Sequence, residues 1–196
     1  MKILYFEIEP IQHPYAEEKN TNYEIWSKIK LVHEDSKIKT VLFDWQWDLL
    51  EIHTWFSNCV DHLTEQFPYE NPNQITISEF AKHIYDKIDF LSEMEHQEYT
   101  KKLEEYFSFH YFKIRGTDLP HYYIGVNKNI GEISRWDNEN NVYLKYNFEM
   151  EKFIDDTKNV LRKTITKWID VNTTKAEKLI KRIQEIEAGS NYSIFN

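Results

Sequence analysis

Three acidic residues are spaced for acid–base chemistry at one point of the chain. Asp44, Asp48 and Glu51 are four and three residues apart, a spacing that places side chains on one side of a helical turn. Paired carboxylates in a pocket can divide the roles of general acid and general base between them. The same spacing is common on exposed helices, so a solubilising or partner-facing surface is the favoured interpretation.

Two histidines near these acids could bind a metal ion. His53 and His62 are nine residues apart. A metal site on a helix needs histidines four residues apart and at least one further ligand, so we predict no metal site and no cofactor. The polar residues of this stretch instead fit the solvent-facing side of one amphipathic helix: Asp48, Glu51, His53, Asp61 and Glu65.

A third group surrounds a predicted turn: His110, Arg115, Asp118 and His121. Loops with such residues are where function concentrates, so this group is the alternative site, in an enzyme that handles a small molecule or nucleotide. A turn explains the same residues, because Asp118 can cap it and Arg115 can pair with Asp118. The chain has no phosphate-binding glycine loop and no Gly-x-Ser-x-Gly, and Cys59 has no Cys-x-x-Cys partner. We therefore assign no catalytic residue.

Hydrophobic periodicity indicates which elements position these residues in the first half of the chain. Alternating apolar and polar residues over 2–9 and 23–32 predict two strands. Apolar residues recur every three or four positions over 45–67, which predicts one long helix. A similar stripe over 78–106 predicts a second helix, or a pair of helices with a break near 91–95.

The second half of the chain begins with a different period. Residues 107–148 alternate and are interrupted by Gly, Asn and Asp turns, which predicts an antiparallel meander of about four strands. Helical stripes over 150–168 and 174–188 predict two closing helices. The predicted fold is α+β in a single domain, residues 1–196. It has an antiparallel sheet, made of the meander plus the N-terminal strand or strands, that is covered by long amphipathic helices.

Charge is distributed very unevenly along the chain. Residues 1–100 carry 8 lysines, no arginine and 19 acidic residues, a net charge of −11, whereas residues 101–196 carry 16 basic and 14 acidic residues, a net charge of +2. Acids are dense around the boundary between the two halves: Glu93, Glu95, Glu98, Glu104 and Glu105. Such a surface repels nucleic acid and anionic membranes and attracts cationic proteins. We therefore predict a basic protein partner, with no direct nucleic-acid contact and no membrane contact.

The composition of the chain also predicts a protein interface and a cytoplasmic location. The 6 tryptophans and 13 tyrosines exceed what one core easily hides, and these residue types anchor protein interfaces. One cysteine, and no apolar run near the ~20 residues that cross a bilayer, predict a cytoplasmic protein. The predicted partner-binding residues combine acids with one aromatic: Asp44, Trp47, Asp48, Glu51, Glu93, Glu95 and Glu98.

One block of the sequence resembles a known family. Residues 113–127, Lys-Ile-Arg-Gly-Thr-Asp-Leu-Pro-His-Tyr-Tyr-Ile-Gly-Val-Asn, and residues 131–134, Gly-Glu-Ile-Ser, resemble a block in a family of small, largely uncharacterised bacterial proteins. There the block reads approximately Arg-Gly-Thr-(Asp/Asn)-x-Pro-x-x-Tyr-Ile-Gly, then Glu-Ile-Ser. Residues 43–51 and 54–56 resemble a helix of the same family. The resemblance implies an accessory bacterial protein and supplies no catalytic residues; acidic proteins of this sort are often immunity partners of secreted toxins.

These observations lead to one expected function and two alternatives. We expect a non-enzymatic acidic inhibitor or binding protein, immunity- or antitoxin-like, that blocks a basic partner such as a toxin by occlusion and charge complementarity. One alternative is the enzyme with its site at the meander loops. The other is a phage counter-defence protein that uses the same acidic surface. The sequence leaves the partner's identity and the oligomeric state open.

Overall fold

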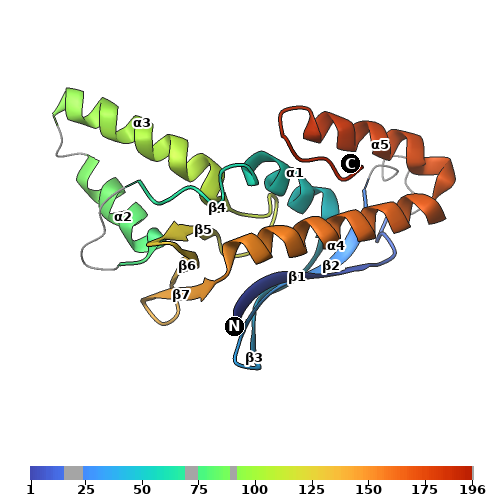
Figure 1. The fold of residues 1–196 in the computed structure, drawn as a ribbon, viewed down its shortest axis with the longest axis horizontal. Helices are drawn as coiled ribbons and strands as arrows, with labels where there is room; N and C mark the ends of the chain where they lie inside the picture. Colours follow the sequence, from blue (N-terminus) through green and yellow to red (C-terminus); the bar gives the residue numbers. More distant parts are fainter. Residues whose placement is uncertain (16–23, 69–74, 89–91, 196) are drawn as a thin grey trace. The chain divides into compact units, whose positions relative to one another are not determined.

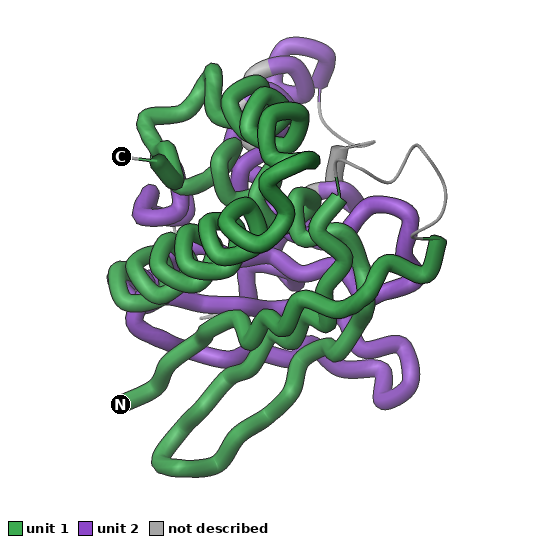
Figure 2. Tube along the Cα trace, turned by 90° about the vertical axis from the view of Figure 1, so that its right-hand side faces the viewer, with its two compact units in different colours: residues 1–61, 151–196 green, residues 62–150 purple. Residues whose placement is uncertain are grey.

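The structure, a computed structural model, describes residues 1–15, 24–68, 75–88 and 92–195. They form two compact units (Figure 2): unit 1 comprises residues 1–61 and 151–196, and unit 2 comprises residues 62–150. Each unit has its own antiparallel sheet and its own helices, which confirms the predicted α+β class. The N-terminal strands and the meander form two sheets, whereas one sheet was predicted. The prediction of a single domain stays a prediction.

The sheet of unit 1 has three antiparallel strands in the order β1-β2-β3 (Figure 1). Strand β1 is Lys2–Pro10, β2 is Trp26–Asp35 and β3 is Ile38–Asp48. Ser36 and Lys37 both have positive φ, 51° and 78°, as a tight two-residue hairpin requires. Strand β1 confirms the strand predicted over residues 2–9. The second predicted strand began at Tyr23, which lies outside the described residues, and β2 begins at Trp26.

Three helices of unit 1 accompany its sheet. Helix α1 is Leu49–Cys59, α4 is Met150–Val171 and α5 is Thr173–Glu187, so both predicted closing helices are confirmed. Helix α4 runs alongside the sheet (Figure 1), and the rings of Phe6 on β1 and Phe153 on α4 are 5.9 Å apart. The buried apolar side chains of the three helices include Ile52, Phe56, Leu161, Leu179 and Ile183.

The sheet of unit 2 is an antiparallel meander, as predicted, and its strands lie in the order β4-β5-β6-β7. Strand β4 is Tyr111–Phe112, β5 is Tyr122–Asn127, β6 is Ile130–Asp137 and β7 is Val142–Phe148. Lys128 and Asn129 have φ of 53° and 63°, and they form the two-residue turn between β5 and β6.

Two helices pack against this sheet: α2, Ile77–Ile88, and α3, Glu93–His110. Side chains of β6 bind the first turn of α2. The backbone N–H of Ile77 donates to Oε1 of Glu132 at 2.6 Å, and that of Ser78 donates to Oγ of Ser134 at 3.1 Å. Because the first N–H groups of a helix lack partners within the helix, these contacts fix where α2 begins. The Glu-Ile-Ser segment of the family-like block therefore has a structural role.

The helix predicted over 45–67 is wrong at both ends. Residues up to Asp48 belong to β3, and α1 ends at Cys59. Asp48 causes the transition, because its Oδ1 accepts the N–H of Leu50 at 3.1 Å and so begins the helix. Trp45 is 39% exposed and belongs to no helical stripe. Asp44, Asp48 and Glu51 therefore do not share a helical turn.

The strand predicted from residue 107 is also wrong at its start. Residues 107–110 form the last turn of α3, and β4 has only two residues. Tyr106, Phe107 and His110 are all buried and lie at positions i, i+1 and i+4 of one helical face, whereas the adjacent residues 106 and 107 would point to opposite faces of a strand. The alternative of two helices over 78–106 is confirmed by α2 and α3.

Candidate functional site

The predicted partner-binding residues of unit 1 lie in different settings. Asp44 is exposed on β3, and its carboxylate lies 3.7 Å from Nζ of Lys28 and 3.5 Å from Nζ of Lys30. Trp47 is half-buried, and its ring centroid lies 5.4 Å from that of Trp26. Glu51 is half-buried in the first turn of α1. Much of the negative charge of this sheet is thus already opposed by neighbouring lysines.

Asp48 is a structural residue of unit 1. It is only 6% exposed. Its carboxylate accepts the N–H groups of Ile25 and Leu50, and Nη1 of Arg182 on α5 donates to Oδ2 at 3.1 Å. Burial raises the pKa of Asp48 above its ordinary value, although Arg182 and the two N–H groups act in the opposite direction. Its oxygens are therefore occupied within the unit.

His53 is fully buried, so its predicted place on a solvated face is wrong. Its Nε2 lies 3.1 Å from Oε1 of Glu187, which also accepts the N–H of Ile194. Burial alone would raise the pKa of Glu187, but His53, the backbone N–H of Ile194 and the hydroxyl of Ser193 together lower it. Cys59 is buried too, and burial raises the pKa of its thiol well above the ordinary range. His53 and Cys59 are therefore parts of the packed interior of unit 1.

The part of the chain that the structure describes contains no three ligand-type side chains placed to share a metal ion. Within the same residues, no helix combines the length and the apolar character needed to cross a bilayer.

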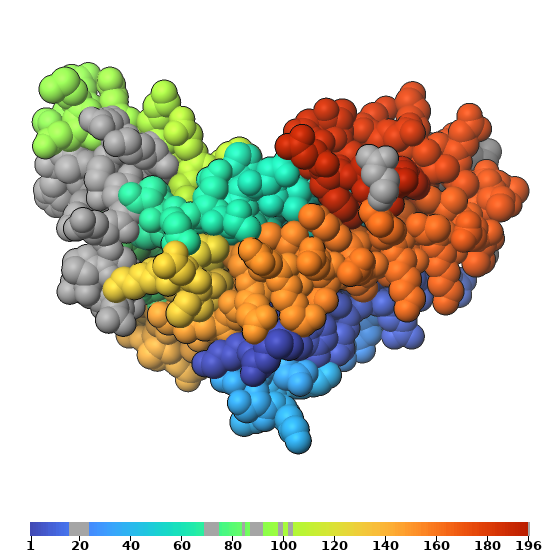
Figure 3. Space-filling model, in the orientation of Figure 1, coloured from blue at the N-terminus to red at the C-terminus, as the bar shows by residue number. Residues whose placement is uncertain are grey.

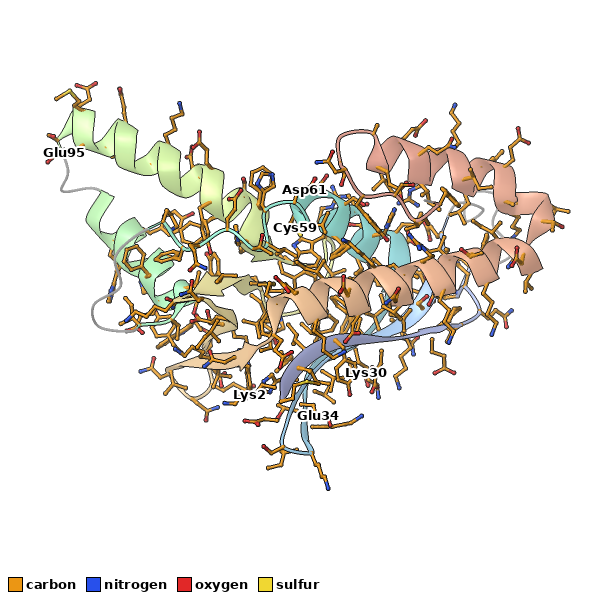
Figure 4. The ribbon with its side chains drawn as sticks, viewed as in Figure 1. Lys2, Lys30, Glu34, Cys59, Asp61 and Glu95 are labelled. Atoms are coloured by element: carbon orange, nitrogen blue, oxygen red, sulfur yellow. The ribbon has the colours of Figure 1, made fainter. Side chains whose placement is uncertain are left out.

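Helix α3 of unit 2 carries an exposed acidic face. Figure 3 shows the described part of this helix, in yellow-green, at the surface, and Figure 4 labels Glu95 at its first turn. Its exposed acids are Glu93, Glu95, Glu104 and Glu105. Glu98 belongs to the same helix, but its side chain lies outside the described part. Positions 95, 98 and 105 are three and seven residues apart, so they lie on one side of the helix. We call Glu95, Glu98 and Glu105, together with Glu93 at the first residue of the helix, the acidic face of α3, whereas Glu104 lies on another side of the helix.

Glu95 also stabilises the start of this helix. Its carboxylate accepts the backbone N–H of Ser92 at 3.3 Å and the hydroxyl of the same residue. These hydrogen bonds lower the pKa of Glu95, so its negative charge is held at the N-terminus of α3.

A groove of about 550 Å³ opens beside the last turns of α3. Residues from two separate segments line it: His62, Glu65, Gln66, Pro68, Glu105, Tyr106 and Phe109. One wall is the segment 62–68 and the other is α3. Each wall contributes one exposed glutamate, Glu65 or Glu105. We call this the acidic groove.

The short strand β4 explains why segment 62–68 reaches this position. Because β4 begins only at Tyr111, opposite Tyr123, it does not reach Val126 near the end of β5, and the carbonyl of Val126 accepts the N–H of Phe67 at 2.9 Å. Gln66 pairs with Val126 as an isolated parallel bridge, and its Oε1 accepts the N–H of Asn129 at 3.2 Å. The buried ring of Phe67 anchors the segment in the core of unit 2.

Two stacked pairs of rings form the aromatic part of the groove. The ring of His62 stacks on that of Phe109 at 3.8 Å and 15°, and the ring of His110 stacks on that of Tyr106 at 3.7 Å and 8°. Glycine at 125 permits the second pair, because a Cβ there would lie 2.4 Å from Oη of Tyr106 and 2.8 Å from Cδ2 of the histidine. Nδ1 of His62 lies 2.8 Å from Oε1 of Glu65.

Burial keeps the second stacked pair, His110 and Tyr106, uncharged at neutral pH. It lowers the pKa of His110, and the Tyr106 carbonyl that accepts from Nδ1 only partly opposes this. Burial, and then the carboxylates of Glu132 and Glu65, raise the pKa of Tyr106 far above its ordinary value. At neutral pH the groove therefore presents negative charge on its walls without positive charge from His110.

The lowered pKa of His110 predicts a pH-dependent stability of unit 2. The unfolded chain takes up this proton near the ordinary value of 6.5 and the folded chain only at lower pH, so stability is complete above 6.5 and falls as pH drops below it. Replacing His110 with Phe keeps the ring stack and removes the proton site. We expect the urea concentration at the midpoint of unfolding to decrease less between pH 8 and pH 5 in this variant than in wild type. An equal loss in both proteins would contradict the assignment.

The alternative site at the meander loops is divided between the interior and the surface. His110 is fully buried against Tyr106, whereas Arg115, Asp118 and His121 are exposed. Gly116 has a φ of 75°, and the hydroxyl of Thr117 donates to the carbonyl of Ile114 at 2.8 Å, so this part of the block forms a turn. The ring of His121 lies 5.4 Å from that of Tyr111.

The acids of α3 were predictable from the sequence, whereas the groove was missed. Glu65 was expected on the face of a long helix, and Gln66 and Phe109 were not singled out at all. Forty residues separate the two walls of the groove, and their contact depends on the bridge between Gln66 and β5, which leaves no local pattern in the sequence. Comparison of the chain with models of protein families, with curated proteins and with solved structures finds no match in any of the three.

Proposed function

We propose that this chain is a non-enzymatic acidic binding protein, immunity- or antitoxin-like, that blocks a basic partner protein such as a toxin. The observation that carries the proposal is the exposed acidic face of α3, at whose end a groove has one glutamate on each wall beside stacked rings. Charge and aromatic surface together are what a protein-binding site for a cationic partner needs.

The acidic face of α3 would supply steering and the groove would supply the tight contact. Exposed charges of one sign speed the encounter with an oppositely charged partner, and the effect weakens as salt screens them. Met94, 81% exposed among these glutamates, offers an apolar contact at the same surface. The bound protein would then block the partner by covering its functional surface. Unit 1 contributes less to this proposal, because Asp48 is occupied internally and Asp44 faces two lysines.

Two finer parts of the proposal concern the compartment and the class of protein. We propose that the protein acts in the cytoplasm, where the buried thiol of Cys59 would stay reduced. A phage counter-defence protein would use the same acidic surface on a different target. The enzyme alternative has less support, since His110 is buried behind Tyr106 and the other three residues of that group are exposed.

Affinity capture with charge-reversed bait tests this function. The bait is presented to an extract of the native host at low and moderate salt, as wild type, as Glu93→Lys/Glu98→Lys and as Glu177→Lys/Glu185→Lys. The last variant makes the same charge change at exposed positions of α5. We expect wild type and the α5 variant to retain one basic protein that the α3 variant loses, because only the α3 variant alters the acidic face.

The same experiment has clear contrary outcomes. Retention of no protein, or of an acidic one, would contradict the proposal. Equal loss in the two variants would show that net charge alone decides binding and would remove the role of α3. Retention of a small molecule without a protein would favour the enzyme.

A further inference from the structure

We infer that the acidic groove of unit 2 binds an arginine side chain of the partner. The inference rests on the proposed function and names the chemistry of its central contact. It follows from the charges, the rings and the size of the groove.

The charges of the groove suit a forked cation. Glu65 and Glu105 stand on opposite walls, on segments that the fold brings together from 40 residues apart. A guanidinium group has five N–H donors in a planar fork and can bond carboxylates on two sides, whereas an ammonium group is a compact point charge. Two separated carboxylates therefore favour arginine over lysine.

The rings of the groove suit a planar cation. Phe109 and His62 stack with a small interplanar angle, and Tyr106 contributes a second aromatic wall. Guanidinium groups stack on aromatic faces and lose little hydration in doing so. The three groove residues of α3, Glu105, Tyr106 and Phe109, fall within about one turn of the helix, so one side chain can meet both kinds of group.

The ring of Tyr106 closes the inner side of the groove. Tyr106 lines the groove and is only 5% exposed, and its hydroxyl lies in the core of unit 2 against Gly125, where a Cβ would be 2.4 Å away. Tyr106 therefore offers an occupant of the groove an aromatic surface.

The groove is large enough to admit a side chain. Its volume is about 550 Å³. Gln66 and Phe67 are held by hydrogen bonds to Asn129 and Val126, so this wall is fixed before binding. A preformed site loses less entropy on binding than one that must first be ordered.

A peptide titration followed by NMR tests the inference. The probes are the amidated pentapeptides Gly-Gly-Arg-Gly-Gly and Gly-Gly-Lys-Gly-Gly, added to the full-length ¹⁵N-labelled protein. We expect saturable shifts in the amide signals of residues 62–68 and 105–110 with the arginine peptide, and weaker binding of the lysine peptide. Glu105→Gln should weaken the arginine peptide about tenfold, as expected for loss of one charge-assisted hydrogen bond.

Glu104→Gln is the matched control, because it removes the same charge from the neighbouring exposed position outside the groove. It should leave the arginine affinity within about twofold, since its charge acts only through solvent at a distance. Equal binding of the two peptides, shifts confined to other segments, or equal effects of the two variants would overturn the inference. If the peptide fails while capture still depends on Glu93 and Glu98, the groove inference fails and the proposed function stands.

Discussion

Replacing Asp48 with alanine is expected to lower the free energy of unfolding of unit 1 by about 3 kcal/mol. The change removes a helix cap, worth about 1 kcal/mol, and leaves the N–H of Ile25 without its acceptor. It also removes one partner of a buried ion pair, which costs about 3–5 kcal/mol when both groups are fully buried. The lower end applies, because the side chain of Arg182 is 33% exposed.

Asp44→Ala is the control for this variant. Asp44 lies four residues earlier on the same strand, but its carboxylate is exposed beside Lys28 and Lys30, so its loss should change stability by about 0.5 kcal/mol or less. Urea denaturation followed by tryptophan fluorescence measures both variants. Similar midpoints for Asp48→Ala and wild type would contradict the structural role assigned to Asp48.

Replacing Glu132 with alanine is expected to destabilise unit 2 by about 3 kcal/mol. Glu132 is almost fully buried, and its two oxygens accept the N–H of Ile77 at 2.6 Å and the side-chain amide of Asn127 at 2.9 Å. Alanine leaves these donors unsatisfied, at about 1–3 kcal/mol each, and removes the charge that stabilises the N-terminus of α2. Hydrogen exchange at the first amides of α2 should rise together with the loss of stability.

Two further variants separate the causes. Glu132→Gln keeps one acceptor without the charge, and we expect it to lose about half as much stability as alanine. Glu139→Ala, at an exposed position after β6, should remain within about 0.5 kcal/mol of wild type. Equal stability of Glu132→Ala and Glu139→Ala would show that the capping contacts contribute little.

Local patterns predicted those elements whose contacts are themselves local. Strands β5, β6 and β7 are short alternating runs joined by tight turns, and Asn129 in the β5–β6 turn is a residue type that accepts the positive φ that the hairpin needs. The apolar stripes of α4 and α5 repeat at the helical period without a competing interpretation. The class of the fold followed from these elements.

Strand β3 was missed because a bulge hides its period. In the pairing with β2, Leu31 faces Phe43 and Val32 faces Val41, so Leu42 is an extra residue that shifts the alternation. The spacing of Trp45, Leu49 and Ile52 then matches a helix by coincidence. Asp48 followed three residues later by Glu51 is a helix-start signal that could have placed the boundary correctly.

The candidate site was predictable only in part, for a related reason. The glutamates of α3 are close together in sequence, so their charge density is evident from composition alone. The groove needs Glu65 opposite Glu105 and His62 stacked on Phe109, and both pairings arise from long-range packing. No local pattern likewise indicates that the carboxylate of Asp48 pairs with Arg182, 134 residues away.

Calorimetric titration of the captured basic protein into this chain tests the central claim most directly. We predict that Glu93→Lys/Glu98→Lys weakens binding about tenfold or more, that Glu177→Lys/Glu185→Lys leaves it within about twofold, and that added salt weakens wild-type binding. Equal weakening by the two variants, or binding that neither variant nor salt changes, would contradict a partner site on the acidic face of α3.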